Sequence, residues 1–393
     1  MIRSKVKPSL TLALLQKVRD LRAQGKDIAS FAAGEPDFDT PAVVTEAAYQ
    51  SMKRGNTRYV ATQGQANLRT AIAKDYQKRL HVPWCGPEHV IATAGAKEGI
   101  YLGLAALLDR GDQVIVPKPY WVSYPDVVKA AGGTCVFLDT HVKDGFFPTV
   151  AQLEGVYSDR TKALIFSSPS NPVGTMIRRE HLKEVVDWCV KRKVVLFYDE
   201  LYERLVLDGS EHVCPLSLVK EEDSDYIMSI NAFSKTLAMT GWRLGFLVTS
   251  KENIAALSPL QGQFMTCLPG FVQDAAVAGL ENVDSFLPAF VTAFKGRLKL
   301  ILEELAKIPH IKVAKPSGAF YVFVDVSEVM KKKGISIDYT FCEQLLEDEL
   351  LAVIAGSSMG MPNWIRLSFA CSENEIREGT KKLAKFCSTD NSY

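Results

Sequence analysis

Short apolar runs alternate with longer amphipathic stretches between about residues 45 and 280. The runs are apolar at nearly every position, which is typical of strands buried on both faces of a parallel sheet. The stretches between them repeat apolar residues every three or four positions, as helices do. We therefore predict an α/β domain over residues 45–280, with a mainly parallel sheet flanked by helices. Its predicted strands are 89–94, 113–116, 134–138, 162–166, 194–198, 226–230 and 242–248, and its predicted helices include 97–109, 124–131 and 178–191.

The segments outside this range have a different pattern. The N-terminal segment fits an amphipathic helix better than a signal peptide, because Thr11 and then Gln16 interrupt its apolar stretch. Towards the C-terminus, helices and strands follow one another without regular alternation, which is typical of an α+β domain. We predict a second, smaller domain from residues 1–44, with an N-terminal arm, and 281–393. Its predicted elements are helices 286–306 and 373–386 and strands 320–324, 352–354 and 364–369.

The composition narrows the classes of function. With 393 residues, 47% of them hydrophobic, the chain can bury a substantial core. Its net charge of +1 gives no electrostatic reason to expect nucleic acid or an anionic membrane as a partner. The eight cysteines include no C-x-x-C pair and the six histidines no H-E-x-x-H spacing, so we predict neither a disulfide framework nor a metal site. No stretch is apolar enough to cross a bilayer, and we expect a soluble, cytoplasmic protein.

One lysine stands where it can do chemistry. The apolar run 226–230 ends in small residues and is followed by Ser234 and Lys235, and Arg243 comes eight residues after the lysine. Lysine suits Schiff-base chemistry because burial and nearby cations can lower its pKa and free the amine. Pyridoxal phosphate (PLP) needs such a lysine, a phosphate clamp and an acid at its ring nitrogen. A surface lysine in a turn is the alternative. The choice between the two depends on whether the rest of the sequence supplies the other contacts that PLP needs.

Two motifs after predicted strands could hold parts of a cofactor. Gly95, Ala96 and Lys97 lie between a strand and a helix, where small residues let backbone N–H groups approach a phosphate. The loop 168–174 contains two prolines that fix the direction of the Asn171 amide. An ordinary turn explains either motif equally well.

Two further motifs supply an acid and aromatic rings. Asp199 ends an apolar strand and Tyr202 follows three residues later. A buried carboxylate needs a cationic or hydrogen-bonding partner, and a protonated pyridine nitrogen is one; a helix N-cap is the alternative for Asp199. The segment 119–124 gathers aromatic residues after a strand, and one of them can stack on a flat ring. Core packing is the alternative there.

In this order along the chain, these motifs resemble those of the class I aminotransferases of the PLP fold type I superfamily. The resemblance runs nearly end to end, from residues 33–38 to 365–368, and the segments PYWVSYP, AMTGWRLG and KPSLT are similar to the bacterial branch of aspartate aminotransferases. It implies PLP as cofactor and a homodimer with shared active sites. It also implies that Lys235 binds the cofactor and moves the substrate proton, that Asp199 pairs with the ring nitrogen, and that Tyr202 and Asn171 bind the ring oxygen.

The resemblance assigns the phosphate and stacking contacts as well. Trp121 stacks on the ring, and Tyr59 reaches the phosphate of the neighbouring subunit. One departure is Ala232, where many relatives have a serine that meets the phosphate. The remaining phosphate contacts are Gly95, Ala96, Lys97, Ser234 and Arg243.

For the substrate, the resemblance assigns the α-carboxylate to Arg366, a bidentate task to which lysine is poorly suited. Gly34 lets the backbone approach the substrate, and Trp121 and Asn171 also face it. In this branch the distal carboxylate meets Lys97, with help from Ser9 and Thr11. These residues are cationic or polar here, so acidic amino acids and 2-oxo acids are the predicted substrates.

Other functions stay open at this stage. A lysine before Pro-Ser, here Lys7, is associated with the use of prephenate in this branch, although Lys7 could equally be a solvated charge. A PLP lyase or an aminotransferase for aromatic or neutral amino acids could carry the same cofactor contacts. A ligand-sensing regulator would carry a DNA-binding domain ahead of this module, whereas this nearly neutral sequence starts with the family's N-terminal arm. We predict an aminotransferase with a ping-pong mechanism.

Overall fold

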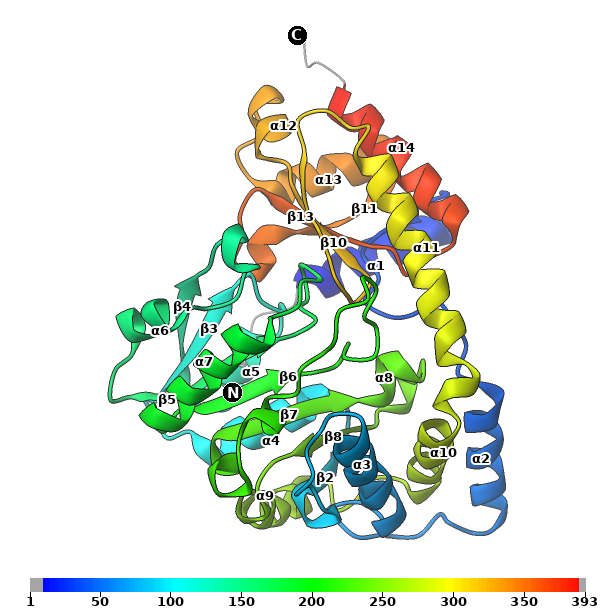
Figure 1. Cartoon of the computed structure of the whole chain (residues 1–393). Helices are drawn as coiled ribbons and strands as arrows, with labels where there is room; N and C mark the ends of the chain where they lie inside the picture. The colour runs from blue at the N-terminus through cyan, green and yellow to red at the C-terminus, as the bar shows by residue number, and fades with distance from the viewer. Residues whose placement is uncertain (1–9, 389–393) are drawn as a thin grey trace, which may run out of the picture.

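A seven-stranded sheet forms the centre of the molecule in the computed structural model, which describes residues 10–388 and side chains from residue 16 onward (Figure 1). The strand order is β2-β8-β7-β6-β5-β3-β4, and only β8 runs antiparallel to its neighbours. The predicted mainly parallel sheet is confirmed. The strands are β2 (Val90–Thr93), β3 (Gln113–Lys118), β4 (Thr134–Asp139), β5 (Thr161–Ser167), β6 (Val195–Asp199), β7 (Ile227–Ala232) and β8 (Gly245–Val248).

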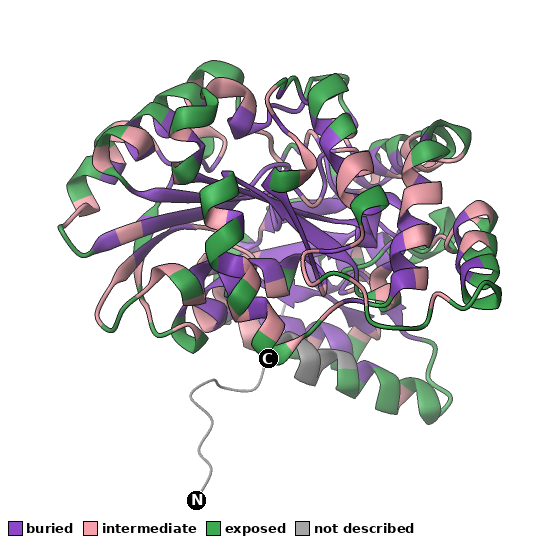
Figure 2. Ribbon diagram, turned by 90° about the horizontal axis from the view of Figure 1, so that it is seen from below, coloured by how far each residue is buried: buried purple, intermediate pink, exposed green. Residues whose placement is uncertain are grey.

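Helices cover both faces of this sheet, and Figure 2 shows the buried strands between helices with exposed outer sides. Neighbouring residues on a strand point to opposite faces, so Leu196 joins one hydrophobic core and Phe197 the other. Burial on both sides explains the continuous apolar runs of the sequence. The helices around the sheet are α2 (Ala42–Lys53), α3 (Ala66–Lys78), α4 (Ala96–Leu107), α5 (Tyr124–Ala130), α6 (Val150–Val156), α7 (Arg179–Arg192), α8 (Phe233–Thr236), α9 (Lys251–Phe264) and α10 (Gly270–Glu281).

The carboxyl ends of three central strands lie side by side. Ser167 of β5 pairs with Asp199 of β6, and Asp199 pairs with Ile230 of β7. In a parallel sheet the segments that follow such strand ends meet at one edge. The register therefore brings Asp199, the loop that carries Asn171 and the short helix α8 to the same place.

The second part of the chain packs above this edge in Figure 1. A four-stranded antiparallel sheet has the order β12-β13-β10-β9, and β1 pairs in parallel with β11, which ties the N-terminal segment to the C-terminal one. The α+β character predicted for this part is confirmed. Its elements are α1 (Leu10–Ala23), β1 (Ala29–Ser30), α11 (Leu287–Leu305), β9 (Lys312–Ala314), β10 (Tyr321–Asp325), α12 (Ser327–Lys332), α13 (Asp338–Glu349), β11 (Leu351–Ala352), β12 (Ile354–Ala355), β13 (Trp364–Ser368) and α14 (Glu373–Ser388).

Two predicted strands differ from the structure. The strand expected over 242–248 begins only at Gly245, because Thr240–Trp242 forms a 3₁₀ turn and Arg243 has a left-handed backbone with φ 56°. A residue in that conformation cannot continue a strand. The strand expected over 352–354 is divided between β11 and β12, which belong to different sheets.

The two parts of the chain have separate hydrophobic cores, which can be compared with the predicted domains. Val283 belongs to a core of the central sheet, whereas Phe294 belongs to the core of the second part together with Phe31. The change of core supports a division of the chain near the predicted boundaries, although Val44 and Val283, which lie just outside residues 45–280, both belong to the central core. The boundaries at 44/45 and 280/281 stay a prediction. Over residues 10–388, no helix is both long and apolar enough to span a bilayer.

Candidate active site

A pocket of about 200 Å³ lies where the strand ends of the central sheet face the second part of the chain. Half of the residues predicted for the site line it, and its lining residues lie up to 334 positions apart in the sequence (Ala32 to Arg366). Neither part of the chain forms the pocket alone. The lining residues are Ala32, Gly34, Ala96, Trp121, Val122, Asn171, Asp199, Leu201, Tyr202, Lys235, Tyr321 and Arg366.

Lys235 projects into this pocket from α8, directly after β7. Its side chain is buried, and its Nζ donates a hydrogen bond to the carbonyl oxygen of Gly34. Burial lowers the pKa of Lys235 to about 8, and the charges of Arg366 and Arg243 act in the same direction while Glu35 opposes them. The amine is therefore neutral in a large fraction of molecules near pH 8, as a nucleophile toward an aldehyde must be.

Asp199 ends β6 and is buried beside the lysine. The Tyr124 hydroxyl donates to Oδ2 at 2.8 Å, and the Leu201 backbone N–H donates to Oδ1 at 3.1 Å. Burial raises the pKa of Asp199 to about 6, and these hydrogen bonds limit the rise. The residues after Asp199 form a turn rather than a helix, so it is not an N-cap. Tyr124 orients this carboxylate but was not predicted as a site residue. In the sequence it is only one of several aromatic residues in the segment 119–124.

Two tyrosine hydroxyls meet at the side of the pocket. Tyr202 Oη and Tyr321 Oη are 2.9 Å apart, and their rings meet edge to face. Burial raises the pKa of Tyr202 well above its ordinary value, so the hydroxyl stays protonated and can donate. Tyr321 was not predicted as a site residue, because the run around it is indistinguishable from a buried strand in the sequence.

Arg366 faces the pocket from β13 and is 4% exposed. Its Nη1 donates to Asn171 Oδ1 at 3.1 Å and its Nη2 to the Ala32 carbonyl oxygen at 3.2 Å. The Nε atom is buried without a hydrogen-bond partner among the described residues. A buried guanidinium with a free N–H donor suits a carboxylate ligand, because a buried donor without a hydrogen-bond partner costs free energy.

The turn before α4 forms a small cradle next to a cation. Gly95 has φ +83°, and a Cβ there would lie 2.5 Å from Arg243 Nη2. That guanidinium is held by the carbonyl oxygens of Thr240 at 2.9 Å and Ala94 at 3.2 Å. Backbone N–H groups at a helix start and a guanidinium together suit a phosphate. Arg243 reaches this place from a left-handed backbone conformation, with φ 56°.

Lys97 lies beside the pocket on the same helix. Its Nζ is 5.0 Å from the centre of the Trp121 ring, which lines the pocket. Burial and, next, the charge of Arg243 lower the pKa of Lys97. The Trp121 ring in turn meets the Tyr124 ring edge to face.

Some predicted residues are not brought into the pocket. Tyr59 is 87% exposed, and Ser234 is buried in α8 without lining the pocket. Ser9 and Lys7 lie outside the described residues; Thr11 lies in α1, but its side chain is outside the described part. No group of three or more His, Cys, Asp or Glu between residues 10 and 388 could hold a metal ion.

These residues fit PLP. The amine of Lys235 can bond reversibly to an aldehyde, the buried Asp199 suits a protonated ring nitrogen, and the cradle at Gly95 has room for a phosphate where a larger residue would fill it. When bound, PLP supplies the aldehyde and a ring that withdraws electrons. On a mainly parallel sheet with an α+β companion, this arrangement defines a PLP-dependent enzyme.

A model of the family "Aminotransferase class I and II" matches residues 26–383. The chain belongs to this family, whose members use PLP to exchange amino groups between amino acids and 2-oxo acids. The predicted aminotransferase class, the cofactor and the amino acid and 2-oxo acid substrates are confirmed.

Named relatives cover nearly the whole chain. A probable aspartate/prephenate aminotransferase from Aquifex aeolicus is 38% identical over 384 residues, which is 97% of this chain and 96% of that protein. An aspartate aminotransferase from Bacillus sp. (strain YM-2) is 36% identical over 96% of each chain. The structure of aspartate aminotransferase from Thermus thermophilus with maleate matches with a TM-score of 0.91 at 35% identity, covering 98% of this chain and 100% of that one. The predicted bacterial branch is therefore confirmed.

Proposed function

We propose that this aminotransferase moves the amino group between aspartate or glutamate and the 2-oxo acids 2-oxoglutarate and oxaloacetate. The observation that carries the proposal is a pair of cations at the pocket: the buried Arg366 lines it, and Lys97 lies beside it, over the Trp121 ring. A dicarboxylic substrate presents two carboxylates and can use both. The names of the aspartate aminotransferases that resemble the chain support this substrate class.

The roles of the residues follow from their surroundings. Lys235 Nζ, with a pKa of about 8, can take a proton from the substrate Cα near neutral pH and return it elsewhere. Asp199 would hold the ring nitrogen, and Tyr202 and Asn171 the ring oxygen. Arg366 would fix the α-carboxylate, so that the Cα hydrogen stays near the amine. Two half-reactions in turn then give the ping-pong mechanism that we predict.

Lys97 is the residue that tests the substrate class. Replacement by methionine removes the charge but keeps much of the length, so kcat/KM for aspartate should fall at least about tenfold. Activity with alanine, which lacks a distal carboxylate, should change little. Lys129→Met on the exposed face of α5 is the control. Equal losses for aspartate and alanine, or a wild-type rate confined to phenylalanine, alanine and cystathionine, would contradict the proposal.

Prephenate is the second candidate substrate. The name of the Aquifex aeolicus relative includes it. We predicted a contribution from Lys7, which lies outside the described residues, as do Ser9 and the side chain of Thr11. Lys7→Ala should lower kcat/KM for prephenate and leave that for oxaloacetate unchanged; an equal effect on both would remove Lys7 from specificity.

We also propose a homodimer in which each active site uses Tyr59 of the other subunit. The exposure of Tyr59 (87%), Tyr49 (51%) and Phe264 (50%) in the single chain supports a partner that covers them. Light scattering should give twice the chain mass. Mixed dimers of inactive Lys235→Ala with Tyr59→Ala chains should regain activity, because one site of the hybrid receives both intact residues. No gain on mixing would contradict the shared site.

The cytoplasmic location stays a proposal. The cysteines, all of which lie within the described residues and are unpaired, support a reducing compartment. Cell fractionation with an antibody to the chain would test it, and recovery of the protein outside the cytoplasmic fraction would contradict it.

A further inference from the structure

A cluster of buried polar side chains lies behind the active-site acid, on the residue that follows it. Glu200 is fully buried, and its carboxylate accepts hydrogen bonds from His212 Nε2 at 2.6 Å, from Cys214 Sγ at 3.4 Å and from the Ser229 hydroxyl. Tyr76 on α3 shares a 2.6 Å hydrogen bond with Ser229. The loop with His212 and Cys214 and the strand β7 thus supply three donors to one carboxylate, and Tyr76 joins through Ser229; these five residues are here called the Glu200 cluster.

The hydrogen bonds of the cluster fit an ionised Glu200 carboxylate, because all of them run toward its oxygen atoms. Burial raises the pKa of Cys214 and of Tyr76 well above their ordinary values, so both groups stay protonated and act as donors. Three donors that converge on one carboxylate stabilise its ionised form. His212 Nδ1 is buried without a partner in the described part of the chain. The hydrogen bond to Glu200 places a proton on Nε2, whereas a proton on Nδ1 would have no partner among the described residues.

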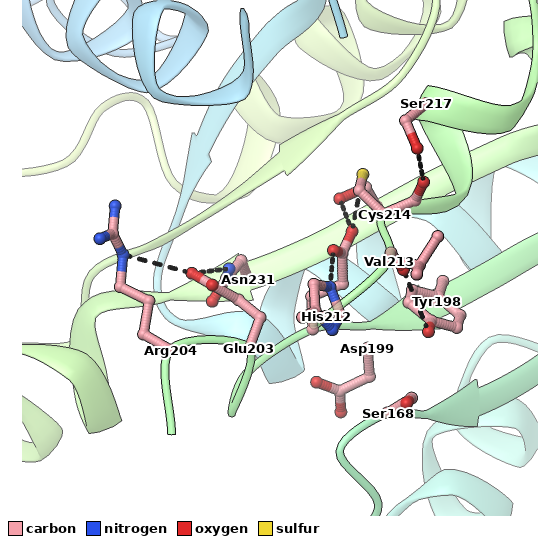
Figure 3. A network of polar contacts seen from close by, with 12 residues as sticks. Ser168, Tyr198, Asp199, Glu203, Arg204, His212, Val213, Cys214, Ser217 and Asn231 are labelled. Atoms are coloured by element: carbon pink, nitrogen blue, oxygen red, sulfur yellow. Dashed lines mark hydrogen bonds and ion pairs between the residues drawn. The ribbon is translucent and has the colours of Figure 1, made fainter. Parts of the chain in front are cut away.

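This charge stands directly behind Asp199. Successive residues of an extended strand point to opposite sides. In Figure 3 the Asp199 carboxylate accordingly points away from His212 and Cys214. The backbone N–H of Glu200 donates to the Ile230 carbonyl oxygen at 2.8 Å, which holds the residue after Asp199 to the end of β7. The charge of Glu200 is among the causes that raise the pKa of Asp199 to about 6, after burial and against the Tyr124 hydrogen bond.

We propose that Glu200 is a positioning residue that acts through Asp199, as a second buried carboxylate that strengthens the bond between Asp199 and the protonated ring nitrogen of the cofactor. The groups facing Asp199 are Tyr124, which donates to it, Lys235, whose charge opposes the effect, and Glu200. Two negative charges on one side of a cationic nitrogen attract it more than one does. The inference rests on the part of the proposed function that gives Asp199 the ring nitrogen.

A purely structural role is the competing explanation, because the cluster also joins α3, β7 and the loop before Cys214. The two explanations differ in what they predict for a cofactor without a ring nitrogen. The deaza analogue of PLP has C–H in place of the ring nitrogen. If the role is structural, loss of Glu200 should weaken the binding of PLP and of the analogue to the same extent. If its charge acts through Asp199, loss of Glu200 should weaken the binding of PLP alone.

The test is the equilibrium dissociation constant of the full-length enzyme for PLP and for the deaza analogue, without any amino acid. In Glu200→Gln, which keeps the shape and removes the charge, the constant for PLP should rise about tenfold and that for the analogue should change less than about twofold. Ser229→Ala removes one donor but keeps the charge, and it should change the ratio of the two constants little. Equal weakening of both ligands, or no weakening, in Glu200→Gln would overturn the proposal.

Three further variants keep the test decisive. If Glu200→Gln does not fold, the single variant His212→Gln is compared with the double variant Glu200→Gln/His212→Gln. In the double variant the two amides can bond to each other, and it differs from the single variant only in the charge at residue 200. Asp199→Asn separates this inference from the proposed function. A change of the ratio in Asp199→Asn without one in Glu200→Gln overturns the role of Glu200 alone, whereas no change in either removes Asp199 from the ring nitrogen. The substrate assignment is untouched by all of these results.

Discussion

The hydroxyl groups of Tyr202 and Tyr321 are 2.9 Å apart and share a hydrogen bond across the two parts of the chain. Tyr202 follows β6 of the central sheet, and Tyr321 begins β10 of the smaller one. The Tyr321 ring also lies 4.5 Å from the guanidinium carbon of Arg366. One side chain therefore contacts both the tyrosine proposed for the ring oxygen and the arginine proposed for the substrate.

Two substitutions at Tyr321 should separate these contacts. Tyr321→Phe keeps the ring under Arg366 and removes the partner of Tyr202, so PLP should bind a few-fold more weakly, about 1 kcal/mol for one hydrogen bond. KM for aspartate should stay near the wild-type value. Tyr321→Leu also removes the ring and should raise KM, because the cation–π contact and the support of Arg366 are lost. Titrations with PLP and steady-state kinetics measure the two effects, and identical kinetics for both variants would contradict the division.

Arg366→Lys should raise KM for aspartate at least about tenfold and change kcat less, because one point charge replaces a two-pronged donor. Asn171 and Ala32 would also lose their present hydrogen bonds from it. The matched control is Arg192→Lys, which loses a two-pronged contact with Glu154 on the outer side of α7, away from the pocket. Unchanged KM in Arg366→Lys would remove this arginine from substrate binding.

Much of the fold could be predicted because the buried strands of a parallel sheet are apolar throughout. Strand ends also locate chemistry, and Asp199 and Lys235 were found by that rule. The conformation of Arg243 could not be predicted, because nothing in the local sequence reveals that a non-glycine residue has positive φ. The strand predicted to start at residue 242 was wrong for this reason.

The residues that sequence reasoning missed depend on tertiary contacts. Tyr321 looks like any other aromatic residue of a core strand until β10 is placed beside Tyr202. Glu200 was visible as an acid after Asp199, but its partners lie 12 to 29 residues further along the chain. A buried charge with distant partners has no local pattern. The one usable signal in the sequence is a polar residue directly next to a predicted catalytic strand end, as Glu200 is next to Asp199.

The pKa of Lys235 gives a prediction of pH dependence. Only the neutral amine attacks the aldehyde, and burial lowers the pKa from its ordinary value of 10.5 to about 8. As pH rises from 7 to 9, the neutral fraction and therefore the rate of covalent PLP capture by the cofactor-free chain should increase about tenfold and then level off. Stopped-flow absorbance measures the rate. N-acetyl-lysine under the same conditions should continue to gain rate up to about pH 10, and a parallel profile for the chain would contradict the lowered pKa.

Lys235→Ala should abolish that capture while PLP still binds through its other contacts. After borohydride reduction, mass spectrometry should find the wild-type chain heavier by the cofactor mass less one oxygen atom, because water leaves when the amine condenses with the aldehyde and reduction adds two hydrogens. The variant should gain no mass. Turnover should fall by many orders of magnitude, because no other amine within the described residues of the pocket can replace it. Lys97→Ala should still be labelled. Labelling of Lys235→Ala at another lysine, with activity retained, would overturn the assignment.

Gly95→Ala tests the phosphate cradle. The added Cβ would lie 2.5 Å from Arg243 Nη2 at a backbone φ of +83°, so the guanidinium must shift away from the start of α4. PLP affinity should fall about tenfold or more, since a charged hydrogen bond to the phosphate is lost. Gly132→Ala is the control, because its φ is +94° but no atom lies within 4 Å of the added Cβ. Both variants should lose at least about 1 kcal/mol of unfolding free energy from backbone strain, but only Gly95→Ala should lose cofactor. Wild-type affinity in Gly95→Ala, measured by equilibrium dialysis with PLP, would place the phosphate elsewhere.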